Sequence, residues 1–237
     1  MKNKSVNYKP FLLGSVLILV YFILFDFIIP ANKIFPKLSL IYESVIELFL
    51  HYNLFTGIAI TTSVIYISLS IVLMLFLMFK NLTSVLFKLK SFVKIPFFIF
   101  ILLFAFWFGT AIWGEFIFAF LLIVLHLSYK SSSNLDDESN NFIEFAKINK
   151  LKTGTIGKIN SHFINERLIV ELRKTHFYLW TFIIIYEFIN KTGGLGSVIE
   201  NIYNNYDLAG LFALSIIIYI LIFIGDFLYT LIKKQIK

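Results

Sequence analysis

Long apolar runs separated by short polar segments dominate the pattern of this chain. A helix needs about 20 apolar residues to cross the hydrocarbon core of a bilayer, with about 17–25 as the usual range. Apolar runs of roughly this kind cover residues 11–29, 55–79, 95–113, 115–129, 175–190 and 209–232. The pattern therefore predicts an all-α integral membrane protein with about six transmembrane helices. The third to fifth runs are short, so we expect other parts of the protein to shield their ends.

Two further segments show helical periodicity outside these runs. Residues 39–52 gather apolar side chains on one face and place Glu43 and Glu47 four residues apart, which predicts an amphipathic helix on the surface. Residues 130–174 form the one long polar segment. We predict a polar linker there, followed by short helices at 141–150 and 158–173. Gly154 and Gly157 interrupt the pattern between these two helices. A tight turn is expected near residues 113–115.

Composition supports the membrane interpretation. The 237 residues are 59% hydrophobic, against about 45–50% in soluble domains. The net charge is +7, which by itself could suggest nucleic acid. However, six crossings with both termini inside place 18 of the 21 Lys and Arg residues on one side. This asymmetry is the positive-inside pattern, so we interpret the basic charge as membrane topology, with cytoplasmic termini, and expect no nucleic-acid partner.

Several kinds of chemistry are not expected. The chain has no cysteine, which excludes disulfides, thiol catalysis and Cys-based metal sites. The histidines at 51, 126, 162 and 176 lack metal-binding spacing, so neither a metal nor another cofactor is predicted. A GxxxxGK[ST] phosphate loop is also missing, so the chain cannot hydrolyse ATP by that route. We expect residues 1–10 to be a cytoplasmic tail before a first helix that is not cleaved.

The segment 174–199 carries the most informative polar residues. Glu187 lies within an apolar run, where a carboxylate costs about 3 kcal/mol on insertion scales, so it is a functional candidate by default. It either lines a translocation pathway or is the buried partner of a group on another helix. Trp107 and Trp180 are either packing anchors or part of such a pathway. After the apolar run, Gly194, Leu195 and Gly196 predict a tight turn.

Several short motifs occur in one gap-free register between residues 95 and 196. They are Ile95-Pro96, Trp107-Phe108-Gly109, Glu144-Phe145-Ala146, Glu171-Leu172-Arg173, Trp180, Tyr186-Glu187 and Gly194-Leu195-Gly196. In this order they resemble permeases of the nitrate, sulfonate and taurine class of bacterial ABC importers, which belong to the binding-protein-dependent transport family. Asp207 and Asp226 also fit this pattern. The chain departs from it at Lys150, where the family has glycine, and at His162 and Glu166, where it has proline.

The resemblance implies a type I ABC importer permease architecture with a cytoplasmic coupling helix. Residues 11–237 would form a single transmembrane permease domain, with a coupling loop at about 130–174. The residues implied to contact the ATPase are Glu144, Ala146, Lys147, Lys150, Gly154 and Gly157. The implied partners are a cytoplasmic ATPase dimer, a second permease copy, most simply in a homodimer, an external solute-binding protein and the lipid bilayer of the bacterial plasma (inner) membrane. Sulfonates, nitrate and thiamine-precursor pyrimidines are the range of solutes.

A protein of another class would share much of this pattern. A polytopic membrane scaffold without transport activity, or a membrane-embedded enzyme, would also have about six apolar helices. The enzyme would need clustered intramembrane His, Asp, Ser or Cys, whereas the sequence shows only isolated carboxylates. We therefore expect a transport subunit that is not itself an enzyme.

Overall fold

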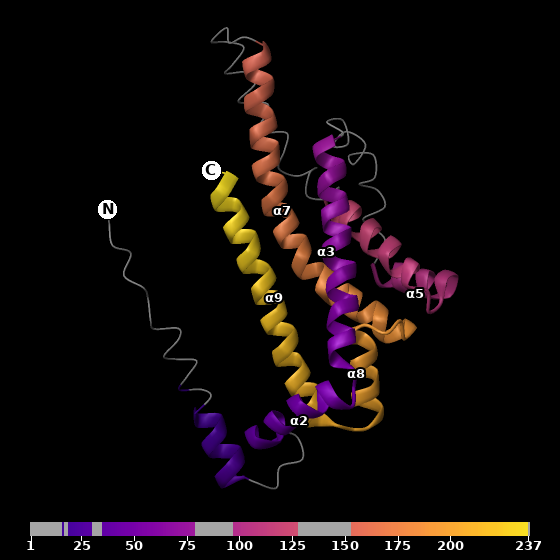
Figure 1. Cartoon of the computed structure of the whole chain (residues 1–237), viewed down its shortest axis with the longest axis vertical. Helices are drawn as coiled ribbons and strands as arrows, with labels where there is room; N and C mark the ends of the chain where they lie inside the picture. The colour runs from indigo at the N-terminus through magenta and orange to yellow at the C-terminus, as the bar shows by residue number, and fades with distance from the viewer. Residues whose placement is uncertain (1–15, 17–18, 30–34, 79–96, 128–152, 237) are drawn as a thin grey trace. The chain divides into compact units, whose positions relative to one another are not determined.

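The computed structural model describes residues 16, 19–29, 35–78, 97–127 and 153–236, which Figure 1 draws as ribbons. Every regular element in these ranges is a helix, and they contain no strand. The predicted all-α class is therefore confirmed for this part of the chain. The predicted tail at 1–10, the helix at 141–150 and the coupling residues Glu144, Ala146, Lys147 and Lys150 lie outside the described residues.

Several of the helices coincide with apolar runs, and others extend beyond them or lie between them. They are η1 (Ile23–Ile28), α2 (Leu38–Leu50), α3 (Leu54–Met78), α5 (Phe97–Phe108), the helix Ile112–Leu127, α7 (Thr153–Asn190), α8 (Leu195–Asn204) and α9 (Leu208–Ile236). The predicted amphipathic helix at 39–52 corresponds to α2. Two of these helices contain stretches long and apolar enough to cross a bilayer, Leu54–Leu75 and Leu208–Leu231. The apolar helices Leu19–Ile28, Phe98–Phe108 and Ile112–Leu127 are shorter.

The predicted helix at 158–173 is present, but its predicted bounds were wrong. Gly154 and Gly157 do not separate two helices, and the helix expected at 158–173 does not end before the apolar run. Instead, α7 is one helix of 38 residues from Thr153 to Asn190. A glycine costs only about 1 kcal/mol in a helix, so two glycines in the first turns need not interrupt it. At 1.5 Å per residue α7 is about 57 Å long, nearly twice the thickness of a hydrocarbon core.

The turn expected near residues 113–115 lies a few residues earlier. α5 ends at Phe108, and Gly109 follows with φ of +53°. The amide of Gly109 donates to the carbonyl of Ala105 at 2.9 Å, so this glycine ends the helix in the left-handed conformation that glycine adopts easily. The next helix begins at Ile112. Glu115 is consequently in the first turn of a helix and not in a loop.

The chain divides into two compact units, the first of which comprises residues 1–54 and 199–218. Its N-terminal part is held by Asp26 of η1, whose carboxylate accepts the amide of Leu38 at 3.0 Å and the hydroxyl of Ser39 at 3.1 Å. The amide of Leu38 is an unpaired donor at the start of α2, so Asp26 caps that helix from outside it. Asp207 directly precedes α9, and its carboxylate accepts a hydrogen bond from the amide of Gly210 at 2.8 Å.

The second unit comprises residues 55–198 and 219–237. It contains most of α3, α5, the helix Ile112–Leu127, α7 and the end of α9, and α7 contacts α5, α3 and α9 (Figure 1). Its core is built from aliphatic and aromatic side chains: Ile65, Ile101, Phe118, Ile123, Leu179, Ile183 and Tyr186 are fully buried. Phe118 and Tyr186 stack with ring centroids 5.1 Å apart, which joins the helix Ile112–Leu127 to α7. This unit holds two clusters of polar residues, one around Glu187 and one around His176.

Candidate functional site

The end of α7 and the start of α8 form a tightly packed corner. Lys191 and Gly193 have φ of +56° and +93°, and Gly194 lies in the bend. Leu195 and Gly196 belong to the first turn of α8 and are not in the turn itself. A Cβ on Gly196 would lie 2.3 Å from the carbonyl oxygen of Ile184, so only glycine allows α8 to approach α7 this closely.

Glu187 is fully buried beside this corner, and its carboxylate is satisfied by neutral donors. The hydroxyl of Thr61 on α3 donates to Oε1 at 2.6 Å, and the amide of Gly196 donates to Oε2 at 2.9 Å. Thr61 in turn accepts the amide of Leu195 at 2.8 Å. Glu187 and Thr61 therefore cap the start of α8, where the helix dipole favours a negative charge. The partner that the sequence left open is a hydroxyl and a backbone amide.

A second buried carboxylate, which sequence reasoning did not single out, lies close to the first. Glu115 is fully buried at the start of the helix Ile112–Leu127. It faces Glu187 and Thr192 and interacts electrostatically with Tyr186. Neither of its carboxylate oxygens has a hydrogen-bond partner of ordinary geometry among the described residues. The available signal in the sequence was that Glu115 stands at the start of the apolar run 115–129.

Unpartnered polar atoms gather around this pair of carboxylates. The hydroxyl oxygens of Tyr186 and Thr192 and the amide nitrogen of Asn190 are buried without a hydrogen-bond partner within the described residues. Asn190 faces the hydroxyl of Tyr186. Buried polar groups in proteins are nearly always paired, so a concentration of exceptions at one place is a candidate binding site. We name Glu115, Tyr186, Glu187, Asn190 and Thr192 the carboxylate cluster.

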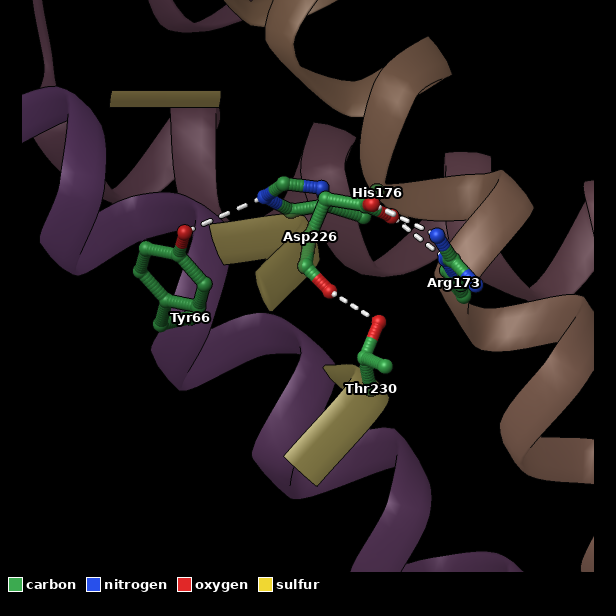
Figure 2. A network of polar contacts seen from close by, with 5 residues as sticks. All are labelled: Tyr66, Arg173, His176, Asp226 and Thr230. Atoms are coloured by element: carbon green, nitrogen blue, oxygen red, sulfur yellow. Dashed lines mark hydrogen bonds and ion pairs between the residues drawn. The ribbon is translucent and has the colours of Figure 1, made fainter. Parts of the chain in front are cut away.

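A separate polar network joins α7 to α3 and α9, and Figure 2 shows five of its members. Arg173 on α7 forms a two-pronged ion pair with Asp226 on α9. Hydrogen bonding to that carboxylate raises the pKa of the Arg173 guanidinium. Thr230 donates to the backbone carbonyl of Asp226 at 3.0 Å. The partner of Asp226 is therefore Arg173, which joins α7 to α9.

His176 is the centre of this network. Its Nε2 accepts the indole N–H of Trp180 at 2.8 Å and lies 3.1 Å from the hydroxyl of Tyr66. An indole N–H can only donate, so Nε2 is the unprotonated nitrogen and the proton of a neutral ring is on Nδ1. A Cβ on Gly225 would lie 2.2 Å from the hydroxyl of Tyr66 and 2.6 Å from Nε2. The glycine therefore permits α9 to pack directly against this histidine.

Several polar residues of α7 share one face. Residues of this face recur at alternating intervals of three and four: Arg173, His176, Trp180, Ile183, Glu187 and Asn190. This spacing is the a/d repeat that usually carries apolar residues at a helix–helix contact. We name these six residues the α7 stripe. Five of them are polar or have a polar ring atom, and the regular spacing was a signal in the sequence that could have identified His176 and Asn190.

The other residues predicted from the sequence have different surroundings. Trp180 is buried, but it bonds His176 and not Glu187. Trp107 on α5 is 65% exposed and does not belong to either polar group. Gly154 and Gly157 lie in the first turns of α7. The structure therefore brings Glu187 together with Thr61 and Gly196 and does not join it to the two tryptophans.

The two polar groups offer different binding chemistry. No group of three or more His, Cys, Asp or Glu residues that could hold a metal ion occurs within the described ranges. The carboxylate cluster presents oxygen atoms, and the His176 network presents an ion pair and a neutral imidazole. Comparison of the chain with known protein families, with curated proteins and with solved structures finds no match.

Proposed function

We propose that this chain is the membrane-spanning permease subunit of an ATP-driven importer in the bacterial plasma membrane. About six helices would cross the bilayer, with both termini in the cytoplasm. The protein would form the translocation pathway for a small solute that an external binding protein delivers. A second permease copy and two cytoplasmic ATPase subunits would complete the transporter. The ordered motifs, the positive-inside asymmetry and the apolar helices support this proposal.

The observation that carries the proposal is the continuity of α7. A permease without a phosphate loop must receive force from its ATPase through a cytoplasmic surface. The predicted coupling residues Glu144, Ala146, Lys147 and Lys150 precede α7 by only a few residues, and Gly154 and Gly157 lie within its first turns. The same helix reaches the buried Glu187 near its other end. One unbroken helix would therefore connect the ATPase contact to the interior of the membrane domain.

Exposed apolar side chains on the helices support the membrane location. Phe106, Trp107 and Met74 are 88%, 65% and 62% exposed, and Tyr219 and Phe223 of α9 are 69% and 61% exposed. Soluble monomers rarely expose large contiguous apolar patches. Lipid tails or a second copy of the chain would cover these surfaces.

The test is isolation of the tagged full-length chain from membranes of its own organism in a mild detergent. An importer subunit should co-isolate an ATPase that contains a GxxxxGK[ST] loop, and the complex should hydrolyse ATP. Glu144→Lys should reduce the amount of bound ATPase about tenfold, because it reverses a charge at the proposed contact. Glu47→Lys, at an exposed position on α2, is the matched control and should leave the complex intact.

Two results would contradict the proposal. Wild-type chain that binds no ATPase would favour the scaffold or the membrane-embedded enzyme. Equal ATPase binding and equal solute uptake by wild type and Glu144→Lys would exclude the coupling role of this loop. Uptake should be assayed with a sulfonate, nitrate and a pyrimidine, because these represent the range of solutes that the resemblance implies.

A further inference from the structure

The carboxylate cluster combines complete burial with unused oxygen atoms. Glu115, Tyr186 and Glu187 have no exposed surface, and Asn190 and Thr192 are each 7% exposed. Of the two carboxylates, Glu187 is already satisfied by the hydroxyl of Thr61 and the amide of Gly196. Glu115 has no such donor among the described residues. Glu115 is therefore the carboxyl group of the cluster that lacks a hydrogen-bond donor among the described residues.

A buried carboxylate without donors costs several kcal/mol, so the fold is expected to supply a compensating group. The neighbouring hydroxyls of Tyr186 and Thr192 are unpartnered too, and they have lone pairs that can act as ligands. Carboxylate and hydroxyl oxygens are hard ligands, which favour hard cations over soft transition metals. A single positive charge would balance Glu115, because Glu187 is already stabilised at the start of α8.

We propose that Glu115, together with Glu187 and the hydroxyls of Thr192 and Tyr186, binds a small monovalent cation. The cation is either an inorganic ion, such as Na⁺ or K⁺, or the ammonium head of an amine. It joins the start of the helix Ile112–Leu127 to the end of α7 and to the turn before α8. This proposal does not depend on the importer function, since it follows from the buried groups alone.

The experiment measures thermal unfolding of the full-length chain in detergent micelles by tryptophan fluorescence. Choline, which is too bulky for a buried site, is replaced at constant ionic strength by Na⁺, K⁺ or methylammonium. Bound cation stabilises the folded state as its concentration rises, so the midpoint should increase by about 5 °C at saturation. A response to Na⁺ or K⁺ identifies an inorganic ion, and a response to methylammonium alone identifies an amine.

Two variants of the cluster and one control variant test whether the response comes from this cluster. Glu115→Gln keeps the shape and removes the charge, so the dependence on cations should disappear. Glu47→Gln makes the same change at an exposed site and should retain it. Thr192→Val keeps both carboxylates and removes one ligand, so it should raise the half-effective concentration about tenfold. This second variant provides the test if Glu115→Gln does not fold.

The proposal is overturned if none of the three cations shifts the midpoint of the wild-type chain. That result would mean that water or a proton compensates Glu115. It is also overturned if Glu115→Gln responds to cations as the wild type does. Both results leave the isolation of an ATPase complex unaffected, so failure of this proposal is distinguishable from failure of the importer function.

Discussion

Thr61 on α3 donates a 2.6 Å hydrogen bond to Glu187 on α7, although 126 residues separate them in sequence. The same hydroxyl oxygen accepts the amide of Leu195 at 2.8 Å. One small side chain therefore joins two helices and the start of a third. This role explains why a threonine occurs at this fully buried position of α3.

Replacement of Thr61 by valine should destabilise the protein by about 2–4 kcal/mol. Valine keeps the shape but leaves the carboxylate of Glu187 without one donor and the amide of Leu195 without its acceptor. Thr62→Val is the matched control, because the Thr62 hydroxyl bonds the carbonyl of Ile58 within its own helix at 2.6 Å. Thermal unfolding in micelles compares the two. Equal losses of stability would show that the contact with Glu187 contributes little.

Gly196→Ala should cost about 3 kcal/mol or more. The added Cβ would lie 2.3 Å from both the carbonyl oxygen of Ile184 and the amide nitrogen of Phe188, which are backbone atoms that cannot move independently. Gly109→Ala serves as the comparison, since Gly109 has φ of +53° but nothing within 4 Å of an added Cβ. Backbone strain alone should cost about 1–2 kcal/mol there. If the two variants lose the same stability, the close approach of α8 to α7 is not tight.

Glu187→Gln should lower stability by about 1–3 kcal/mol and leave uptake per folded molecule unchanged. Glutamine can accept only one of the two donors, and its amide group faces the other. The double variant with Thr61→Val should lose less than the sum of the single changes, because the two residues share one hydrogen bond. Unfolding and uptake are measured on the same preparations. A fully stable variant with altered uptake would instead place Glu187 on the translocation pathway.

The ion pair between Arg173 and Asp226 should contribute only about 1 kcal/mol. The arginine side chain is 43% exposed, and partly hydrated pairs are weak even in good geometry. A double-mutant cycle of Arg173→Gln and Asp226→Asn measures the coupling between α7 and α9. A coupling above about 3 kcal/mol would show that this pair is effectively buried, as it would be within lipid.

Single cysteines can test the membrane orientation, because the chain contains none. Lys147→Cys and Lys158→Cys should react with an impermeant thiol reagent only from the cytoplasmic side. Lys191→Cys, beyond the end of α7, should react only from outside and is the control for access to the opposite face. Labelling of position 147 or 158 in intact cells would reverse the predicted topology.

The positions of the helices were largely predictable from the sequence. Apolar runs at 55–79 and 209–232 became α3 (Leu54–Met78) and α9 (Leu208–Ile236), because a long run of apolar residues has few alternatives to a helix. The predicted end of the run at residue 190 matches the end of α7 at Asn190. The continuity of α7 across Gly154 and Gly157 was missed, since a glycine that interrupts a pattern need not interrupt a helix.

The contacts of the candidate site were much less predictable. Glu187 stood out in the sequence because its run is apolar, but its partner Thr61 lies 126 residues away and could not be inferred from local pattern. Glu115 was assigned to a turn because the end of α5 was placed too late. Helix periodicity describes which residues share a face, whereas the pairing of faces depends on how the helices pack.

The α7 stripe has a mechanical consequence. Arg173, His176 and Glu187 project from the same side of one unbroken helix, and each contacts a neighbouring helix: Asp226 on α9, Tyr66 on α3 and Thr61 on α3. Rotation of α7 about its own axis would turn all three away from their partners in a single step. A twist applied near Thr153 would therefore release contacts about 50 Å further along, near Glu187. Rotation of α7 would therefore couple its two ends, and its rotational angle would decide whether the polar contacts are made or broken.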